Sequence, residues 1–144
     1  MSNEMFVANK GSSFLELPKR NKRRILVVDD ESDIASLFKI SLEYSGFEVE
    51  TYSDPILALS NFKADLYALV LLDVKMPGMN GFELYAEIMK IDNKVKVCFL
   101  TAYDLSYDEF RQKLPTLNVK CFLRKPILIS DLVKRIDLEL YRDE

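Results

Sequence analysis

Short apolar runs alternate with longer segments of helical period along most of the chain. Four runs are apolar nearly throughout, which is typical of strands buried on both faces of a sheet: residues 25–28, 69–72, 95–100 and 121–124. Residues 47–52 alternate between apolar and polar side chains, so they predict a strand at an edge of the same sheet.

Helices are predicted between these strands and after the last one. The first has Ser32 as its N-cap and ends at Gly46, and the second begins with Pro55 in the first helical position. A third helix follows Gly81, and residues 107–114 carry a weak pattern that fits either a helix or a loop. The third helix is expected to bury one stripe: Phe82, Tyr85, Ala86 and Met89. The last helix has the clearest period, with apolar residues at Ile129, Leu132, Val133, Ile136 and Leu140.

Strands that alternate with helices predict a parallel sheet covered on both faces, because each connecting helix packs back on the sheet. The fold class is therefore α/β, a flavodoxin-like (βα)5 three-layer sandwich with a parallel sheet of order 2-1-3-4-5. This order makes the first and third strands neighbours. Side chains that follow them meet in the crevice where such folds bind ligands.

Composition limits the number of domains and the kinds of partner. The 144 residues, 49% hydrophobic and 30% charged, predict one compact domain over residues 23–144 and a flexible tail over residues 1–22. A net charge of −3 argues against a surface built as a whole for nucleic acid. The chain has no His, which excludes a His triad, a His metal site and a phosphohistidine.

Cellular context is predicted from the cysteines, the apolar runs and one basic run. Cys98 and Cys121 lie in apolar segments and are interpreted as buried, unpaired thiols of a reducing compartment. The longest uncharged apolar run, residues 66–72, is too short to span a bilayer, and a soluble cytoplasmic protein is expected. The basic run at residues 19–24 is either a solvated flank, which we favour, or a contact with an acidic partner, nucleic acid or a membrane.

Polar side chains follow four of the predicted strands. Asp29 and Asp30 follow the first strand and Asp73 ends the third, whereas Thr101 and Lys125 follow the fourth and fifth. Carboxylates this close repel one another, and an all-oxygen set without His or Cys favours Mg²⁺. With Lys125 and Thr101 able to hold phosphoryl oxygens, Asp73 can act as a nucleophile and form an aspartyl phosphate.

Four stretches together resemble the receiver domain of two-component response regulators, over about residues 23–141. They are residues 25–31, Ile-Leu-Val-Val-Asp-Asp-Glu, with residues 71–84, 99–102 and 122–126. The resemblance implies that Asp73 is the phosphoacceptor. It also implies that Asp30 binds Mg²⁺ directly and Asp29 mainly through water, and that the backbone carbonyl of Lys75 completes the protein's ligand set.

The same resemblance implies a conformational switch. Thr101 would bond a phosphoryl oxygen and move inward, and Phe122 would rotate into the space it leaves. The surface formed by residues 107–114, the strand 121–124 and the last helix would then be remodelled, and a homodimer through this surface is a further expectation. A cis peptide bond between Lys125 and Pro126 is also implied.

The expected function is that of a stand-alone receiver, although a piece of a longer protein is not excluded by the sequence. It would take a phosphoryl group from a histidine kinase or a phosphotransfer protein and signal to a downstream protein, with no nucleic-acid-binding domain. It would catalyse only its own phosphoryl transfer and autodephosphorylation. The alternatives are a pseudo-receiver without phosphorylation and an aspartyl-phosphate phosphatase, which normally has an acid at the position of Lys75.

Overall fold

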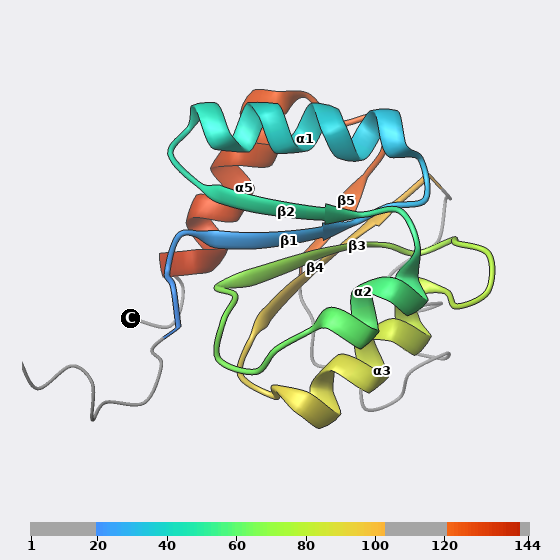
Figure 1. The fold of residues 1–144 in the computed structure, drawn as a ribbon. Helices are drawn as coiled ribbons and strands as arrows, with labels where there is room; N and C mark the ends of the chain where they lie inside the picture. Colours follow the sequence, from blue (N-terminus) through green and yellow to red (C-terminus); the bar gives the residue numbers. More distant parts are fainter. Residues whose placement is uncertain (1–19, 103–120, 142–144) are drawn as a thin grey trace, which may run out of the picture.

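In the computed structural model, residues 20–102 and 121–141 are described, and they form a parallel five-stranded sheet with helices on both faces (Figure 1). The strand order is β2-β1-β3-β4-β5, so the predicted flavodoxin-like arrangement is confirmed. The strands are β1 Arg24–Val28, β2 Glu48–Tyr52, β3 Leu69–Asp73, β4 Lys96–Thr101 and β5 Cys121–Arg124. The helices in these ranges are α1 Ser32–Tyr44, α2 Pro55–Asn61, α3 Gly81–Ile91 and α5 Ile129–Tyr141.

Two apolar cores lie on the two faces of the sheet. Helices α1 and α5 cover one face, and α2 and α3 cover the other (Figure 1). Strand β1 supplies both cores, since Ile25 and Val27 pack toward α1 and α5 while Leu26 and Val28 pack toward α2 and α3. Successive side chains of a strand point to opposite faces, so a strand between two helical layers is apolar throughout. The burial of β1 on both faces fixes the position of its carboxyl end, which Asp29 and Asp30 follow.

The starts of α1 and α3 are capped differently. Asn80 accepts a hydrogen bond from the Glu83 backbone N–H at 2.8 Å, and the Glu83 carboxylate accepts one from the Asn80 N–H at 3.0 Å. This capping box stabilises the helix that follows the Asp73 loop. At α1 the predicted cap is wrong, because Ser32 is the first helical residue and Glu31 occupies the N-cap position without a side-chain cap.

The buried face of α3 differs from the predicted stripe. Leu84 and Ile88 are buried, whereas Ala86 is exposed. Phe82, Tyr85 and Met89 pack against the core as expected. The helix contacts both the sheet and α2, so its apolar face is wider than one stripe. The weakly patterned residues 107–114 lie outside the described residues. No helix within the described ranges has the length and apolar character needed to cross a membrane.

A disulfide joins Cys98 to Cys121, so the prediction of two unpaired thiols is wrong. The two residues pair directly across β4 and β5, and their Cα atoms are 4.6 Å apart. That separation is within the range a disulfide can bridge. Both residues are buried, as the sequence predicted.

The last residues of the predicted tail contact the domain. Arg20 donates hydrogen bonds to the Tyr67 carbonyl at 2.7 Å and to the two carboxylate oxygens of Asp92 at 2.8 and 3.0 Å. The backbone N–H of Asn21 donates to the Leu66 carbonyl at 3.3 Å. Residues 1–19, the rest of the predicted tail, lie outside the described residues.

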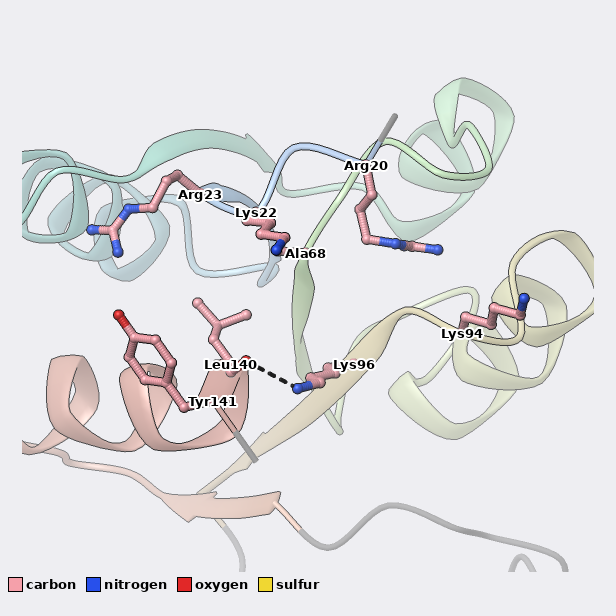
Figure 2. A pocket seen from close by; sticks show the side chains of 8 residues that line it. All are labelled: Arg20, Lys22, Arg23, Ala68, Lys94, Lys96, Leu140 and Tyr141. Atoms are coloured by element: carbon pink, nitrogen blue, oxygen red, sulfur yellow. Dashed lines mark hydrogen bonds between the residues drawn. The ribbon is translucent and has the colours of Figure 1, made fainter. Parts of the chain in front are cut away.

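The amino end of β4 is tied to the end of α5. The Lys96 ammonium donates to the carbonyl of Glu139 at 2.6 Å and to that of Leu140 at 3.2 Å. Figure 2 marks the second of these hydrogen bonds. A cation near the C-terminus of a helix stabilises the carbonyls that have no partner within the helix. This contact holds α5 against the sheet at the amino ends of the strands, whereas the acidic residues lie at their carboxyl ends.

Candidate functional site

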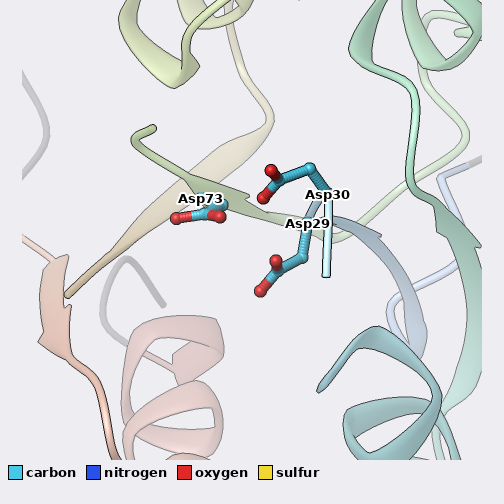
Figure 3. Close-up of side chains that lie close together, drawn as sticks. All are labelled: Asp29, Asp30 and Asp73. Carbon is cyan, nitrogen blue, oxygen red and sulfur yellow. The ribbon is translucent and has the colours of Figure 1, made fainter. Parts of the chain in front are cut away.

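Three carboxylates meet at the carboxyl ends of β1 and β3. Asp29, Asp30 and Asp73 each offer an oxygen, and these oxygens lie within 4.8 Å of one another (Figure 3). They meet because β1 and β3 are adjacent, with Val28 paired to Leu72, so both chains leave the sheet at the same level. Asp29 is fully buried and Asp73 is 5% exposed, whereas Asp30 is exposed. The convergence predicted from the sequence is found.

Lys125 reaches this cluster from the end of β5. Its Nζ lies 2.7 Å from Asp29 Oδ2 and 3.5 Å from Asp73 Oδ2. A third carboxylate, that of Glu31, lies 3.0 Å from the same nitrogen. The Lys125 backbone N–H donates to the Thr101 carbonyl at 2.8 Å, which fixes the chain where it leaves β5. The peptide bond between Lys125 and Pro126 is cis, as expected.

Thr101 and Phe122 lie on neighbouring strands beside the cluster. Thr101 is buried at the end of β4, directly after Leu100, the residue paired with Asp73. The Phe122 ring is partly buried and stacks on the Phe99 ring, with centroids 5.6 Å apart and planes inclined by 18°. Phe122 therefore packs toward the core on the α3 side of the sheet. The roles of both residues in switching stay predictions.

The electrostatics of the site favour a bound cation. Burial, and then the charge of Asp29, raise the pKa of Asp73 to about 7, and the nearby Lys125 ammonium only partly offsets them. Burial alone would lower the pKa of Lys125, but hydrogen bonds to Asp29 and Glu31 and the charge of Asp73 raise it overall. Lys125 is therefore a fixed positive charge, and one ammonium does not neutralise the surrounding carboxylates.

The ligand set fits Mg²⁺. A hard divalent ion prefers carboxylate oxygens, and Mg²⁺ commonly takes one or two carboxylates together with waters and phosphate oxygens. Asp29, Asp30 and Asp73 supply such oxygens, and Asp29 and Asp73 are buried where a cation would relieve their repulsion. Lys75 follows Asp73 by two residues and its side chain is exposed. The contribution of its backbone carbonyl stays a prediction.

Two residues near Asp73 have contacts that the sequence analysis did not anticipate. In the sequence, Glu31 is only the last residue of the stretch 25–31, and its contact with Lys125 depends on the distance between β1 and β5, which is not visible in the sequence. Gly81 was assigned only to the start of a helix. A Cβ there would collide with the Asp73 carbonyl oxygen and lie 2.9 Å from Val74 Cα. The sequence held one indication of this close packing: a glycine at a predicted helix start, shortly after Asp73.

Fold and site together define a class of protein: a parallel α/β domain whose carboxyl edge carries an acidic, Mg²⁺-compatible cluster with a fixed lysine. The chain belongs to the response regulator receiver domain family, whose model matches residues 25–137. It is therefore a receiver domain of two-component signalling, a family of phosphoacceptor switches.

Curated relatives are similar over one part of their own length. Transcriptional regulatory protein YkoG of Bacillus subtilis is 35% identical over 117 residues, which are 80% of this chain and 50% of that protein. The CpxR homolog of Haemophilus influenzae, also named a transcriptional regulatory protein, is 39% identical over 83% of this chain and 51% of its own length. The chain thus spans about half the length of the curated relatives it matches.

Solved receiver structures share the fold over most of their length. A CheY-like receiver domain from Methanospirillum hungatei is 29% identical with a TM-score of 0.72, over 83% of this chain and 94% of that one. Response regulator TrrA of Thermotoga maritima is 34% identical with a TM-score of 0.66, over 80% of this chain and 96% of that one. The TrrA structure is a complex with Mg²⁺ and BeF.

Proposed function

We propose that this receiver accepts a phosphoryl group on Asp73, in a Mg²⁺-dependent reaction, from a histidine kinase or a phosphotransfer protein. The observation that carries the proposal is the position of Asp73, a buried carboxylate between two further aspartates and the Lys125 ammonium. In family members this arrangement belongs to phosphoacceptor switches, and the Mg²⁺–BeF complex of TrrA agrees with a metal-dependent phosphoryl site in that relative.

Asp73 is the proposed nucleophile. One of its carboxylate oxygens attacks phosphorus, a new O–P bond forms, and the bond from phosphorus to the donor breaks with its electron pair on the donor atom. Lys125 holds one phosphoryl oxygen as an ammonium, and Thr101 donates a hydrogen bond to another. When bound by Asp29, Asp30 and Asp73, Mg²⁺ neutralises negative charge on the phosphoryl group.

Signalling is proposed to follow from a population shift at Thr101 and Phe122. A phosphoryl group on Asp73 would draw Thr101 inward, and Phe122, now stacked on Phe99, would move deeper into the α3-side core. The surface of residues 107–114, β5 and α5 would change in consequence, and it remains our candidate for a homodimer contact. Residues 107–114 lie outside the described part of the chain.

We propose two forms for the whole protein. The curated relatives match this chain over about half of their own length, and they are named transcriptional regulatory proteins. A receiver joined to an output domain is therefore an alternative to the stand-alone form. We also propose that the domain turns over no separate substrate and lies in the cytoplasm. A downstream protein is the proposed target in the stand-alone form.

Acetyl phosphate provides the test of phosphorylation. The chain is incubated with acetyl phosphate and Mg²⁺, and its intact mass is followed with time. A single phosphoryl adduct that is lost in Asp73→Asn and in EDTA supports the proposal. Asp33→Asn, an exposed aspartate in the first turn of α1, is the matched control and should retain the adduct. No adduct in the wild-type chain would support the pseudo-receiver, and multiple turnovers of acetyl phosphate would support the phosphatase.

A further inference from the structure

A cavity of about 500 Å³ opens at the amino edge of the sheet, at the opposite end of the strands from Asp73 (Figure 2). Of the eight described residues that line it, five are cationic and none is acidic: Arg20, Lys22, Arg23, Lys94 and Lys96. They come from the segment before β1 and from the start of β4. In a chain with a net charge of −3, such a concentration of positive charge in one cavity indicates an anionic ligand.

Two of these cations are held in place by backbone carbonyls. Arg23 donates to the carbonyls of Ser45 and Gly46 at the end of α1, at 3.0 and 3.4 Å, and its guanidinium carbon lies 3.9 Å from the centroid of the Phe47 ring. Lys96 donates to two carbonyls at the end of α5. Carbonyls at a helix C-terminus carry only a partial negative charge, so they orient these two side chains and offset part of their charge, and a net positive charge is in place before a ligand binds.

The remaining cations differ in their partners. Arg20 is paired with Asp92 and Asp65, so its charge is already neutralised. Lys22 and Lys94 are exposed, and neither side-chain ammonium makes a hydrogen bond or ion pair within the described part of the chain. Four of the cationic residues that line the cavity therefore have no carboxylate partner among the described residues.

We propose that this cavity binds a phosphorylated ligand of nucleotide size. A single phosphate is too small for about 500 Å³, which is within the range of sites for organic ligands. Ala68, Leu140 and Tyr141 supply the apolar part of the lining, and the Tyr141 side chain is 68% exposed, so its ring can stack on a base. Phosphates would lie against Lys22 and extend toward Lys94, which lies at the other side of the cavity (Figure 2).

The inference is independent of the proposed function. The cavity is lined by residues at the amino ends of the strands, and the acidic cluster lies at their carboxyl ends. The two are separated by the length of β3, roughly 16 Å for five residues in extended conformation. Variants at Lys22, Lys94 or Tyr141 should therefore leave the phosphorylation of Asp73 by acetyl phosphate unchanged.

Calorimetric titration of the whole chain with ATP tests the proposal. EDTA is included, so that Mg²⁺ does not join the phosphates of ATP to the aspartates. We expect saturable binding of one ATP per chain that weakens as the salt concentration rises. Tripolyphosphate should bind more weakly than ATP, because it lacks the base. The absence of saturable ATP binding would overturn the proposal, as would tighter binding of tripolyphosphate or of an oligoaspartate peptide.

Charge-reversal variants locate the site. Lys22→Glu with Lys94→Glu should weaken ATP binding by at least about tenfold. Lys63→Glu with Lys134→Glu makes the same change in net charge at exposed lysines outside the cavity lining, and should change ATP affinity by less than about twofold. Equal losses in the two double variants would show a nonspecific charge effect and overturn the proposal.

Substitutions of Tyr141 test whether the ligand contains an aromatic base. Tyr141→Ala should weaken ATP binding by about tenfold through loss of stacking, without changing tripolyphosphate binding. Tyr141→Phe keeps the ring and should restore ATP binding. An unchanged affinity for ATP in Tyr141→Ala would overturn the assignment of a ligand with an aromatic base.

Discussion

The carboxyl group of Asp73 connects the stability of the domain to pH. Burial and the charge of Asp29 raise its pKa in the folded state to about 7 from an ordinary value of 3.8. Between these values the unfolded chain releases a proton that the folded chain keeps. The contribution of Asp73 to stability is therefore fully present below the ordinary pKa and is lost as the pH rises through the folded pKa.

Replacing Asp73 tests this linkage. At about pH 8 and without Mg²⁺, Asp73→Asn should raise the free energy of unfolding by about 2–4 kcal/mol, because a buried charge is removed. At about pH 4 the two proteins should be nearly equal, since Asp73 is protonated in the folded state. Urea denaturation in EDTA at both pH values measures the difference. A gain in Asp73→Asn that is the same at both pH values would contradict the linkage.

Gly81 is required by close packing on the strand that carries Asp73. In Gly81→Ala the new Cβ would collide with the Asp73 carbonyl and crowd Val74. We expect a loss of about 1–3 kcal/mol in the free energy of unfolding and slower phosphorylation of Asp73, because the end of β3 is displaced. Chemical denaturation and the rate of adduct formation with acetyl phosphate measure the two effects.

Gly78→Ala is the control for this prediction. Gly78 has φ +84°, and the nearest side-chain atom to a Cβ there is Ile56 Cδ1 at 3.8 Å. The substitution should cost about 1 kcal/mol through backbone strain alone and leave the phosphorylation rate less affected. An equal effect of both substitutions on that rate would show that crowding at Asp73 is not the cause.

At the scale of elements, Asp92 after α3 joins three segments of the chain. It accepts hydrogen bonds from Arg20 and from the backbone N–H groups of Asp65 and Lys94. Burial alone would raise the pKa of Asp92, but these hydrogen bonds and the charge of Arg20 lower it overall. Its stabilising contribution is therefore present above the ordinary Asp pKa and is lost as the pH falls through the lowered value.

Asp92→Ala tests this junction. At neutral pH we expect a loss of about 2–4 kcal/mol, since the Arg20 charge and two backbone donors lose their partner. The difference from wild type should shrink as the pH falls below about 3.9. Asp65→Asn, which removes the charge of the exposed Asp65 contact with Arg20 and suits the φ of 64° at this position, should cost less than about 1 kcal/mol. A cost for Asp92→Ala no larger than that for Asp65→Asn would contradict the assignment.

Elements differ in how far the sequence predicts them. The buried strands are predicted well, because two-sided burial requires continuous apolar runs such as the one ending at Asp73. The pairing of Cys98 with Cys121 was missed, since it depends on the register between β4 and β5, which apolar runs do not encode. The cap of α1 was also missed, because Ser32 has cap chemistry but Glu31 occupies that position.

For the whole molecule, the strand order determines which distant residues meet. Once the order 2-1-3-4-5 is chosen, Asp29, Asp30 and Asp73 must lie at one edge, and this part of the site was predicted from topology. The distances from Lys125 to Asp29 and Glu31 were not predictable, because they depend on the path of the chain after β5. The amino-edge cavity was missed for the same reason, since its lining comes from segments far apart in sequence.

Mg²⁺ should stabilise the entire domain. An ion that binds only the folded chain raises the free energy of unfolding by about 2.7 kcal/mol at a concentration of 100 times its dissociation constant. Thermal unfolding across a Mg²⁺ titration measures this shift. Asp30→Ala should weaken it, because one proposed ligand is lost, whereas Asp33→Ala should not. A midpoint that does not respond to Mg²⁺ in the wild-type chain would contradict the proposed metal site.

The identity of the phosphorylated side chain is the most direct test of the account. After reaction with acetyl phosphate and Mg²⁺, borohydride reduces an aspartyl phosphate to homoserine, which tandem mass spectrometry of peptides locates. We expect homoserine at Asp73, with Asp29 and Asp30 unmodified. Homoserine at either of those two residues, or at none while the intact chain carries a phosphoryl group, would contradict the account.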